Sequence, residues 1–147
     1  MGIDELIREG SIHSYRASPE EINKALQIAD RDIATALRIR YEDPDWSYNI
    51  AYNAVLQACK AYMFFRGYRP SATENHKSTL AFIMETVEEP WIAKAEYFDR
   101  VRKKRHKLVY DEIGLVSQAE LDNLHSEAPV FINFLKDSIK NKYKYLR

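Results

Sequence analysis

The stretch DPDWSYNIAYNAVLQACKAYMFFRG, residues 43–67, decides the fold class of this chain. It opens with Asp43 and Pro44, which favour the first turn of a helix, and it ends at Gly67, the residue type that most often adopts a left-handed conformation after a helix. Between these signals apolar residues return every three or four positions, so we predict one long helix. One face carries only small side chains, which lets a neighbouring helix pack closely: Ala51, Ala54, Ala58 and Ala61.

The same periodicity precedes and follows this stretch. Residues 18–40 open with Ser18 as the N-cap, Pro19 in the first turn and Glu21 three residues after the cap, which together make a capping box. We expect the buried face of this helix to consist of five residues: Ile22, Leu26, Ala29, Ile33 and Leu37. A second capping box, Ser117 with Glu120, predicts the start of the last helix.

Two more helices are expected in the middle of the chain, over residues 76–87 and over residues 91–111. Residues 3–10 suit a short extra helix at the start. Strand-like alternation is scarce, the chain has only four glycines, and residues 68–75 (YRPSATEN) are typical of a turn. The sequence therefore predicts an all-α fold, an antiparallel bundle of about five helices.

The composition fits a single compact domain over residues 1–147. The chain is 46% hydrophobic and 12% aromatic, which is enough to bury a sizeable core. The first 20 residues have no continuous apolar run, so we expect neither a signal peptide nor a membrane span, and a cytoplasmic protein. The 22 basic and 22 acidic side chains cancel, so any contact with nucleic acid must come from a local patch.

The common metal and cofactor patterns are missing from the sequence. The four histidines never pair at helical spacing, and no glycine-rich phosphate loop is present. Cys59 is the only cysteine, which excludes an intramolecular disulfide and a thiolate zinc cluster, and its place on an apolar helix predicts a buried structural thiol. We therefore expect no metal and no cofactor.

Positive charge gathers in residues 100–107, although the chain as a whole is neutral. Six of these eight residues are basic: Arg100, Arg102, Lys103, Lys104, Arg105 and Lys107. Arg102, His106 and Tyr110 are spaced four apart and share one helical face, which offers a permanent cation, an imidazole and a phenol. These groups suit metal-free cleavage of RNA, in which a base activates the ribose 2′-hydroxyl. A solvated basic face with Tyr110 packed at its end is the structural alternative.

Two segments resemble the HEPN family, the small all-α domains named from higher eukaryotes and prokaryotes nucleotide-binding. Residues 48–70, YNIAYNAVLQACKAYMFFRGYRP, resemble the family's helix of small residues with its Gly-x-x-Pro exit, and residues 100–111, RVRKKRHKLVYD, resemble its motif helix. The likeness covers about residues 18–140. The family motif is an arginine, often followed by a polar residue, with a histidine further along the same helix.

The motif fits the sequence in two registers. In the first, which we prefer, Arg105 is the motif arginine, His106 is the polar second residue and Tyr110 stands at the histidine position. In the second, Arg100 is the motif arginine and His106 is the histidine. The preferred register implies that Arg105, His106 and Tyr110 are catalytic. The neighbouring cations are then expected to contact nucleic acid: Arg100, Arg102, Lys103, Lys104 and Lys107.

The resemblance implies two alternative functions. In one, the chain is a toxin subunit, a metal-independent endoribonuclease or RNA-binding protein whose antitoxin is an MNT-type nucleotidyltransferase. In the other, it is a catalytically inactive module that binds a nucleotide, a nucleic acid or a partner nucleotidyltransferase, because a tyrosine with an unperturbed pKa near 10 is a poor general base at pH 7.

A homodimer is expected for two reasons, besides the family's habit of pairing its motif helices. Arg105 and Tyr110 lie about 140° apart on a regular helix, so a second copy is needed to complete the cleft. The aromatic residues beside the basic run are also expected to be exposed and to meet across the dimer: Trp91, Tyr97 and Phe98.

Overall fold

The computed structural model describes residues 2–73, 75–110 and 113–145, apart from the side chains of residues 109, 110 and 142–145. It is 77% helical, which confirms the predicted all-α class. The elements in chain order are α1 (Ile3–Arg8), β1 (Ile12–Ser14), α2 (Pro19–Ile39), α3 (Pro44–Arg66), β2 (Tyr68–Pro70), α4 (Asn75–Thr86), α5 (Trp91–Tyr110) and α6 (Gln118–Tyr145).

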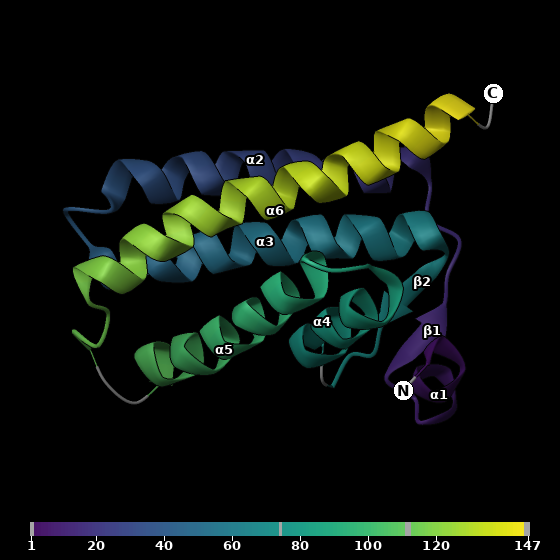
Figure 1. The fold of residues 1–147 in the computed structure, drawn as a ribbon, viewed down its shortest axis with the longest axis horizontal. Helices are drawn as coiled ribbons and strands as arrows, with labels where there is room; N and C mark the ends of the chain where they lie inside the picture. The colour runs from purple at the N-terminus through teal and green to yellow at the C-terminus, as the bar shows by residue number, and fades with distance from the viewer. Residues whose placement is uncertain (1, 74, 111–112, 146–147) are drawn as a thin grey trace.

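The helices form a bundle in which neighbours mostly run in opposite directions. Figure 1 shows that α2 and α5 run one way and α3 and α6 the other, with α4 packed below α3 and the α1–β1 segment at the end where α3 stops. The short extra helix expected at residues 3–10 is α1, and α6 continues through Pro129 to Tyr145. The predicted antiparallel bundle is therefore confirmed, with six helices in the described residues.

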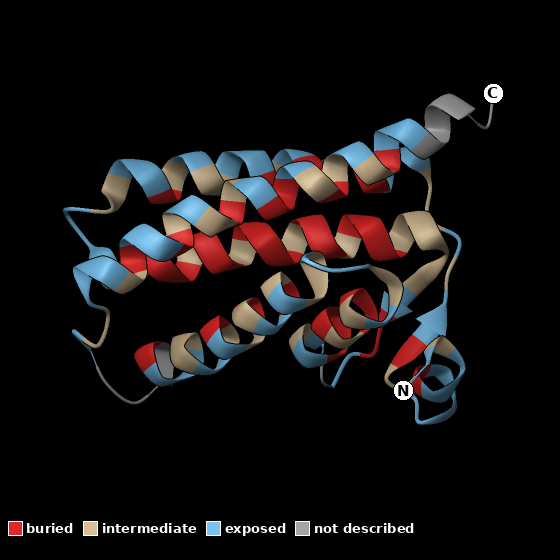
Figure 2. Ribbon diagram, viewed as in Figure 1, coloured by how far each residue is buried: buried red, intermediate tan, exposed pale blue. Residues whose placement is uncertain are grey.

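Helix α3 lies at the centre of the bundle, as its burial in Figure 2 shows. The side chain of Asp43 caps its start by accepting a hydrogen bond from the Trp46 amide at 3.1 Å, and Gly67 ends it with a left-handed φ of 92°. The expected stripe of four alanines is completely buried. Because small side chains let backbones approach, α2, α4, α5 and α6 can all pack against this one helix.

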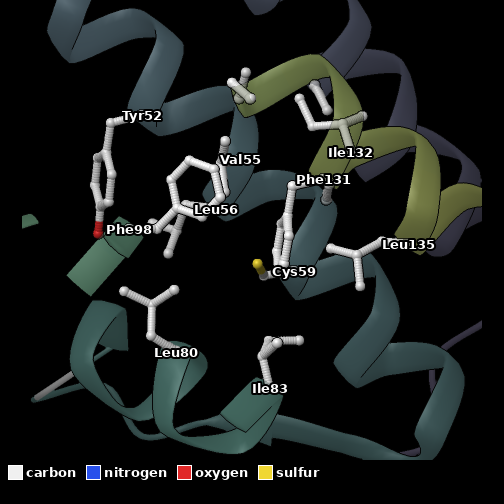
Figure 3. Close-up of a cluster of buried hydrophobic side chains, with 14 of the residues drawn as sticks. Tyr52, Val55, Leu56, Cys59, Leu80, Ile83, Phe98, Phe131, Ile132 and Leu135 are labelled. Atoms are coloured by element: carbon white, nitrogen blue, oxygen red, sulfur yellow. The ribbon is translucent and has the colours of Figure 1, made fainter. Parts of the chain in front are cut away.

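The core contains aromatic residues that the sequence suggested would be exposed. Phe98 is completely buried and its ring lies 5.0 Å from that of Phe131, while Trp91 stacks on Phe134 at 3.9 Å. The expected exposure of Phe98 is therefore wrong, because α6 covers this side chain, while Trp91 and Tyr97 are half-buried against the core. Figure 3 shows side chains of α3, α4 and α6 meeting around the sulfur of Cys59, which is buried as predicted.

The two predicted capping boxes form to different extents. Ser117 and Glu120 make the full reciprocal pair, with both hydrogen bonds at 3.1 Å. At α2 the Ser18 hydroxyl accepts from the Glu21 amide at 3.2 Å, but the Glu21 carboxylate instead accepts a hydrogen bond from Tyr15. Glu21 therefore holds the preceding segment against the start of α2.

The buried face of α2 differs from the prediction at its end. Leu37 is 51% exposed, and Ala36 is the buried residue in the last turns. The cause is the close approach of α3, because the Ser47 hydroxyl donates to the Ala36 carbonyl at 2.7 Å. The hydroxyl has only one proton, so Nε2 of His125 must donate to Ser47 across 2.8 Å, which links α2, α3 and α6.

A small antiparallel sheet includes residues 68–70, which the sequence predicted as part of a turn. Strand β1 pairs with β2 in a register that sets Ile12 opposite Pro70 and Ser14 opposite Tyr68. Three residues per strand are too few to show a period of two, so pattern analysis missed both strands. The sheet matters because the Tyr15 amide donates to the Gly67 carbonyl at 2.9 Å, which fixes the segment after β1 beside the end of α3.

Candidate functional site

The basic run of α5 divides between two sides of the helix. At 100° per residue, Arg102, Arg105 and His106 fall within an arc of about 100°. The remaining cations point elsewhere: Arg100, Lys103, Lys104 and Lys107. Lys104 crosses to α6, where its ammonium lies 3.0 Å from Glu120. The first group faces the start of α4, so the run is not one uniform basic surface.

Arg102 and Arg105 continue the core-facing stripe of α5. The stripe begins with Trp91, Ala95 and Phe98, and the two arginines follow at the same alternating spacing of four and three residues. Apolar side chains would be expected at both positions, because the stripe faces α3 and α4. Cations in such places are costly unless they are paired, and both arginines are held by polar partners.

Arg105 is anchored by α3. Its Nε donates to Oδ1 of Asn49 at 2.6 Å, and the guanidinium lies 5.6 Å from the centre of the Tyr52 ring. Asn49 is only 4% exposed and Tyr52 is completely buried, so both positions are rigid. Arg102 is held in a similar way, since its Nε donates to Asp99 at 2.8 Å. Within the described part of the chain these bonds use Nε, and the terminal nitrogens of a guanidinium can grip an anion in bidentate fashion.

Arg102, Arg105 and His106 of α5 line a hollow of about 330 Å³ together with His76 of α4. We call this hollow the arginine pocket and define it by these four residues. The loop before α4 closes one side with Ala72 and Thr73. Among its described lining residues none is acidic. A pocket of this size whose described polar lining is neutral or cationic suits a phosphate-bearing ligand.

His76 is the functional candidate that sequence reasoning missed. Its Nδ1 lies 3.3 Å from the Tyr52 hydroxyl, and burial together with the charges of Arg105 and Arg102 lowers the pKa of the imidazole. The ring is therefore neutral at neutral pH and can accept a proton. The short connection between α4 and α5 could have indicated it. Two helices joined in this way form a hairpin, in which the start of α4 lies beside Arg102 of α5.

The structure brings two of the three predicted catalytic residues together. Arg105 and His106 share the arginine pocket within one chain, with Arg102 beside them. The side chain of Tyr110 lies outside the described residues. Over the ranges that the structure describes, no group of three His, Cys, Asp or Glu side chains could hold a metal ion, and no helix is long and apolar enough to span a membrane.

Comparison with known proteins identifies one family. The model of the HEPN domain matches residues 22–138, which is most of the chain and includes α3, α4, α5 and the arginine pocket. No match to the chain is found among curated proteins.

Proposed function

Because the chain belongs to the HEPN domain family, we propose that it binds RNA in the arginine pocket and cleaves it without a metal ion, as the toxin subunit of a cytoplasmic toxin–antitoxin pair. Family membership supports a nucleotide- or RNA-related function at the family level. The observation that carries the finer proposal is the meeting of two anchored arginines with two histidines in one pocket free of described acidic groups.

The chemistry needs one group to take a proton and another to supply one. A neutral His76 accepts the proton of the ribose 2′-hydroxyl, whose oxygen then attacks the adjacent phosphorus. The bond from phosphorus to the 5′-oxygen breaks, His106 supplies a proton to that leaving oxygen, and a 2′,3′-cyclic phosphate remains. Arg102 and Arg105 stabilise the extra negative charge of the phosphorane.

Two partners complete this proposal. A homodimer would bring two arginine pockets together. It would also place Tyr110 of one copy near Arg105 of the other, whereas within one regular helix these two positions lie about 140° apart around the axis. An MNT-type nucleotidyltransferase is the proposed antitoxin. The family resemblance supports both, and sedimentation of the purified chain with and without such a partner measures them directly.

The experiment is a cleavage and binding assay with fluorescent single-stranded RNA in EDTA. We expect Arg105→Ala to lower the cleavage rate by about 100-fold, because one charge-stabilising donor is lost. Arg105→Lys keeps the charge but not the bidentate grip, so RNA affinity should fall by about tenfold. Arg31→Ala, an exposed arginine on α2, is the matched control, and circular dichroism checks that each variant folds.

The catalytically inactive alternative has its own support, which is Tyr110 at the position of the family's histidine. It predicts RNA or nucleotide binding that depends on Arg105, without any cleavage by the wild-type protein. Binding and cleavage that both persist unchanged in the Arg105 variants would reject the two versions together.

A further inference from the structure

A second hollow adjoins the arginine pocket. It has a volume of about 600 Å³ and shares two lining residues, Ala72 and Asn75, with the arginine pocket, so the two lie side by side. We call it the aromatic pocket and define it by Tyr15, which follows β1, together with three residues of α3 and β2: Lys60, Phe64 and Arg69. The HEPN motif includes none of them.

The aromatic pocket combines ring faces with cations. The rings of Tyr15 and Phe64 lie 5.4 Å apart at 47°, the ammonium of Lys60 is 5.6 Å from the centre of Phe64, and the guanidinium of Arg69 is 5.9 Å from the centre of Tyr15. The ring of Tyr15 is fixed, because its hydroxyl donates to the Glu21 carboxylate at 3.0 Å. Flat ring faces beside cations are the features on which single-stranded nucleic acids stack.

The charge of the lining distinguishes this groove from the rest of the surface. Lys60, Lys77 and Arg69 join the two pocket arginines along it, and the described lining of both hollows contains no Asp or Glu. The chain as a whole has as many acidic as basic side chains, and a separate hollow at the start of α3, which Asn49 also lines, contains Asp43 and Asp45. A groove whose described charged lining is basic is complementary to a chain of phosphates.

We propose that a single strand of RNA runs from the arginine pocket into the aromatic pocket, where a base beyond the two nucleotides that flank the reacting phosphate stacks on Phe64 or Tyr15. Arg69 and Lys60 contact the phosphate of that nucleotide. This inference rests on the proposed function and adds the form of the substrate. A duplex does not fit, because its bases are already stacked and their faces are hidden from side chains.

The experiment measures affinity, with RNA oligomers of two and six nucleotides that carry 2′-O-methyl groups and so cannot be cleaved. The six-nucleotide strand should bind more tightly than the dinucleotide, and Phe64→Leu should remove that gain, an effect of about tenfold for one stacked base. Tyr15→Leu should act in the same direction, and Arg69→Ala should weaken the salt dependence of binding. The dinucleotide should bind all three variants as it binds the wild type.

Tyr41→Leu is the matched control. Tyr41 is an exposed tyrosine with Arg40 at 4.6 Å from its ring centre, so it has the same chemistry outside the groove. Thermal unfolding shows whether Phe64→Leu folds. Arg69 is exposed, so Arg69→Ala tests the same pocket without removing a packed side chain.

Three results would overturn the inference. If Phe64→Leu, Tyr15→Leu and Arg69→Ala all bind the longer strand like the wild type while Arg105→Lys binds it weakly, the aromatic pocket is not used and the proposed function stands. A six-base-pair duplex that binds as tightly as the single strand rejects the single-strand substrate. If the wild type binds neither oligomer, the proposed function fails and this inference fails with it.

Discussion

The two halves of α5 use one helical face for opposite purposes. In the first half, this face packs into the core, where Phe98 is completely buried and contacts Phe131 of α6. In the second half, Arg102 and Arg105 continue the same stripe but line an open pocket, and Arg105 meets Asn49 of α3. The helix is regular throughout, so the difference lies in the side chains and in what stands opposite them.

The comparison shows that the two arginines stand where apolar side chains would stabilise the core. An apolar residue at position 105 would extend the core without the cost of desolvating a cation, and Asn49 would not be needed as its partner. Residues that break a local pattern and are held by dedicated partners mark functional sites more often than structural ones. We therefore expect substitutions in the first half of α5 to lower the stability of the fold, and substitutions of the arginines in the second half to lower the affinity for RNA.

The largest expected effect tests the structural half. Phe98→Ala removes a fully buried ring between α5 and α6, so the free energy of unfolding should fall by about 3–5 kcal/mol. Urea denaturation followed by circular dichroism measures it. A loss below about 1 kcal/mol would contradict the division of the helix, and Ile113→Ala, at an exposed apolar residue, is the control.

A smaller effect is expected from Asn49→Ala, which removes the acceptor that orients Arg105. Loss of this charge-assisted hydrogen bond should cost about 1.5 kcal/mol of stability, and RNA affinity should fall because the guanidinium is no longer held toward the pocket. Asn53→Ala, one turn along the same helix and outside the lining of the arginine pocket, is the control. Unchanged RNA affinity in Asn49→Ala would contradict the positioning role.

The pH dependence of stability should reflect the pocket as well. Burial first, and neighbouring cations second, lower the pKa of His76 and of His125 below the usual value near 6.5. The unfolded chain therefore binds more protons in the window from about pH 6.5 down to the lowered native values, and stability should fall as the pH falls through it.

Unfolding in urea at several pH values measures this dependence. His76→Gln should flatten the slope below about pH 6.5, and it should leave the part due to His125. The exposed His13 on β1 supplies the control variant, His13→Gln. A free energy of unfolding that increases as the pH falls through this window would contradict the lowered pKa values of the two histidines.

The smallest effect concerns the side of α5 that faces away from the pocket. Lys104→Ala breaks a half-exposed ion pair with Glu120, so stability should change by less than about 1 kcal/mol. RNA affinity should change less than in Arg105→Lys, because Lys104 turns toward α6. A larger loss of affinity in Lys104→Ala would show that the nucleic acid covers both sides of the helix.

Local features of the sequence were enough to predict the helices. Caps, periodic apolar residues and Gly67 each act within a few residues of one another, so α2 to α6 and the central role of small residues in α3 follow from patterns in the chain. The short strands escaped this reasoning because three residues cannot display a period. The exposure of Phe98 was predicted wrongly because the sequence does not tell which helix covers which face.

The sequence by itself determined that six cations and a histidine lie within residues 100–107 of one predicted helix. Only the tertiary structure decided which of them face one another. Arg105 meets Asn49 from 56 residues away, and Tyr52 meets His76 from 24 residues away, because α3 and α4 pack beside α5. Contacts over such separations depend on how whole helices pack, and no local pattern of residues specifies that packing.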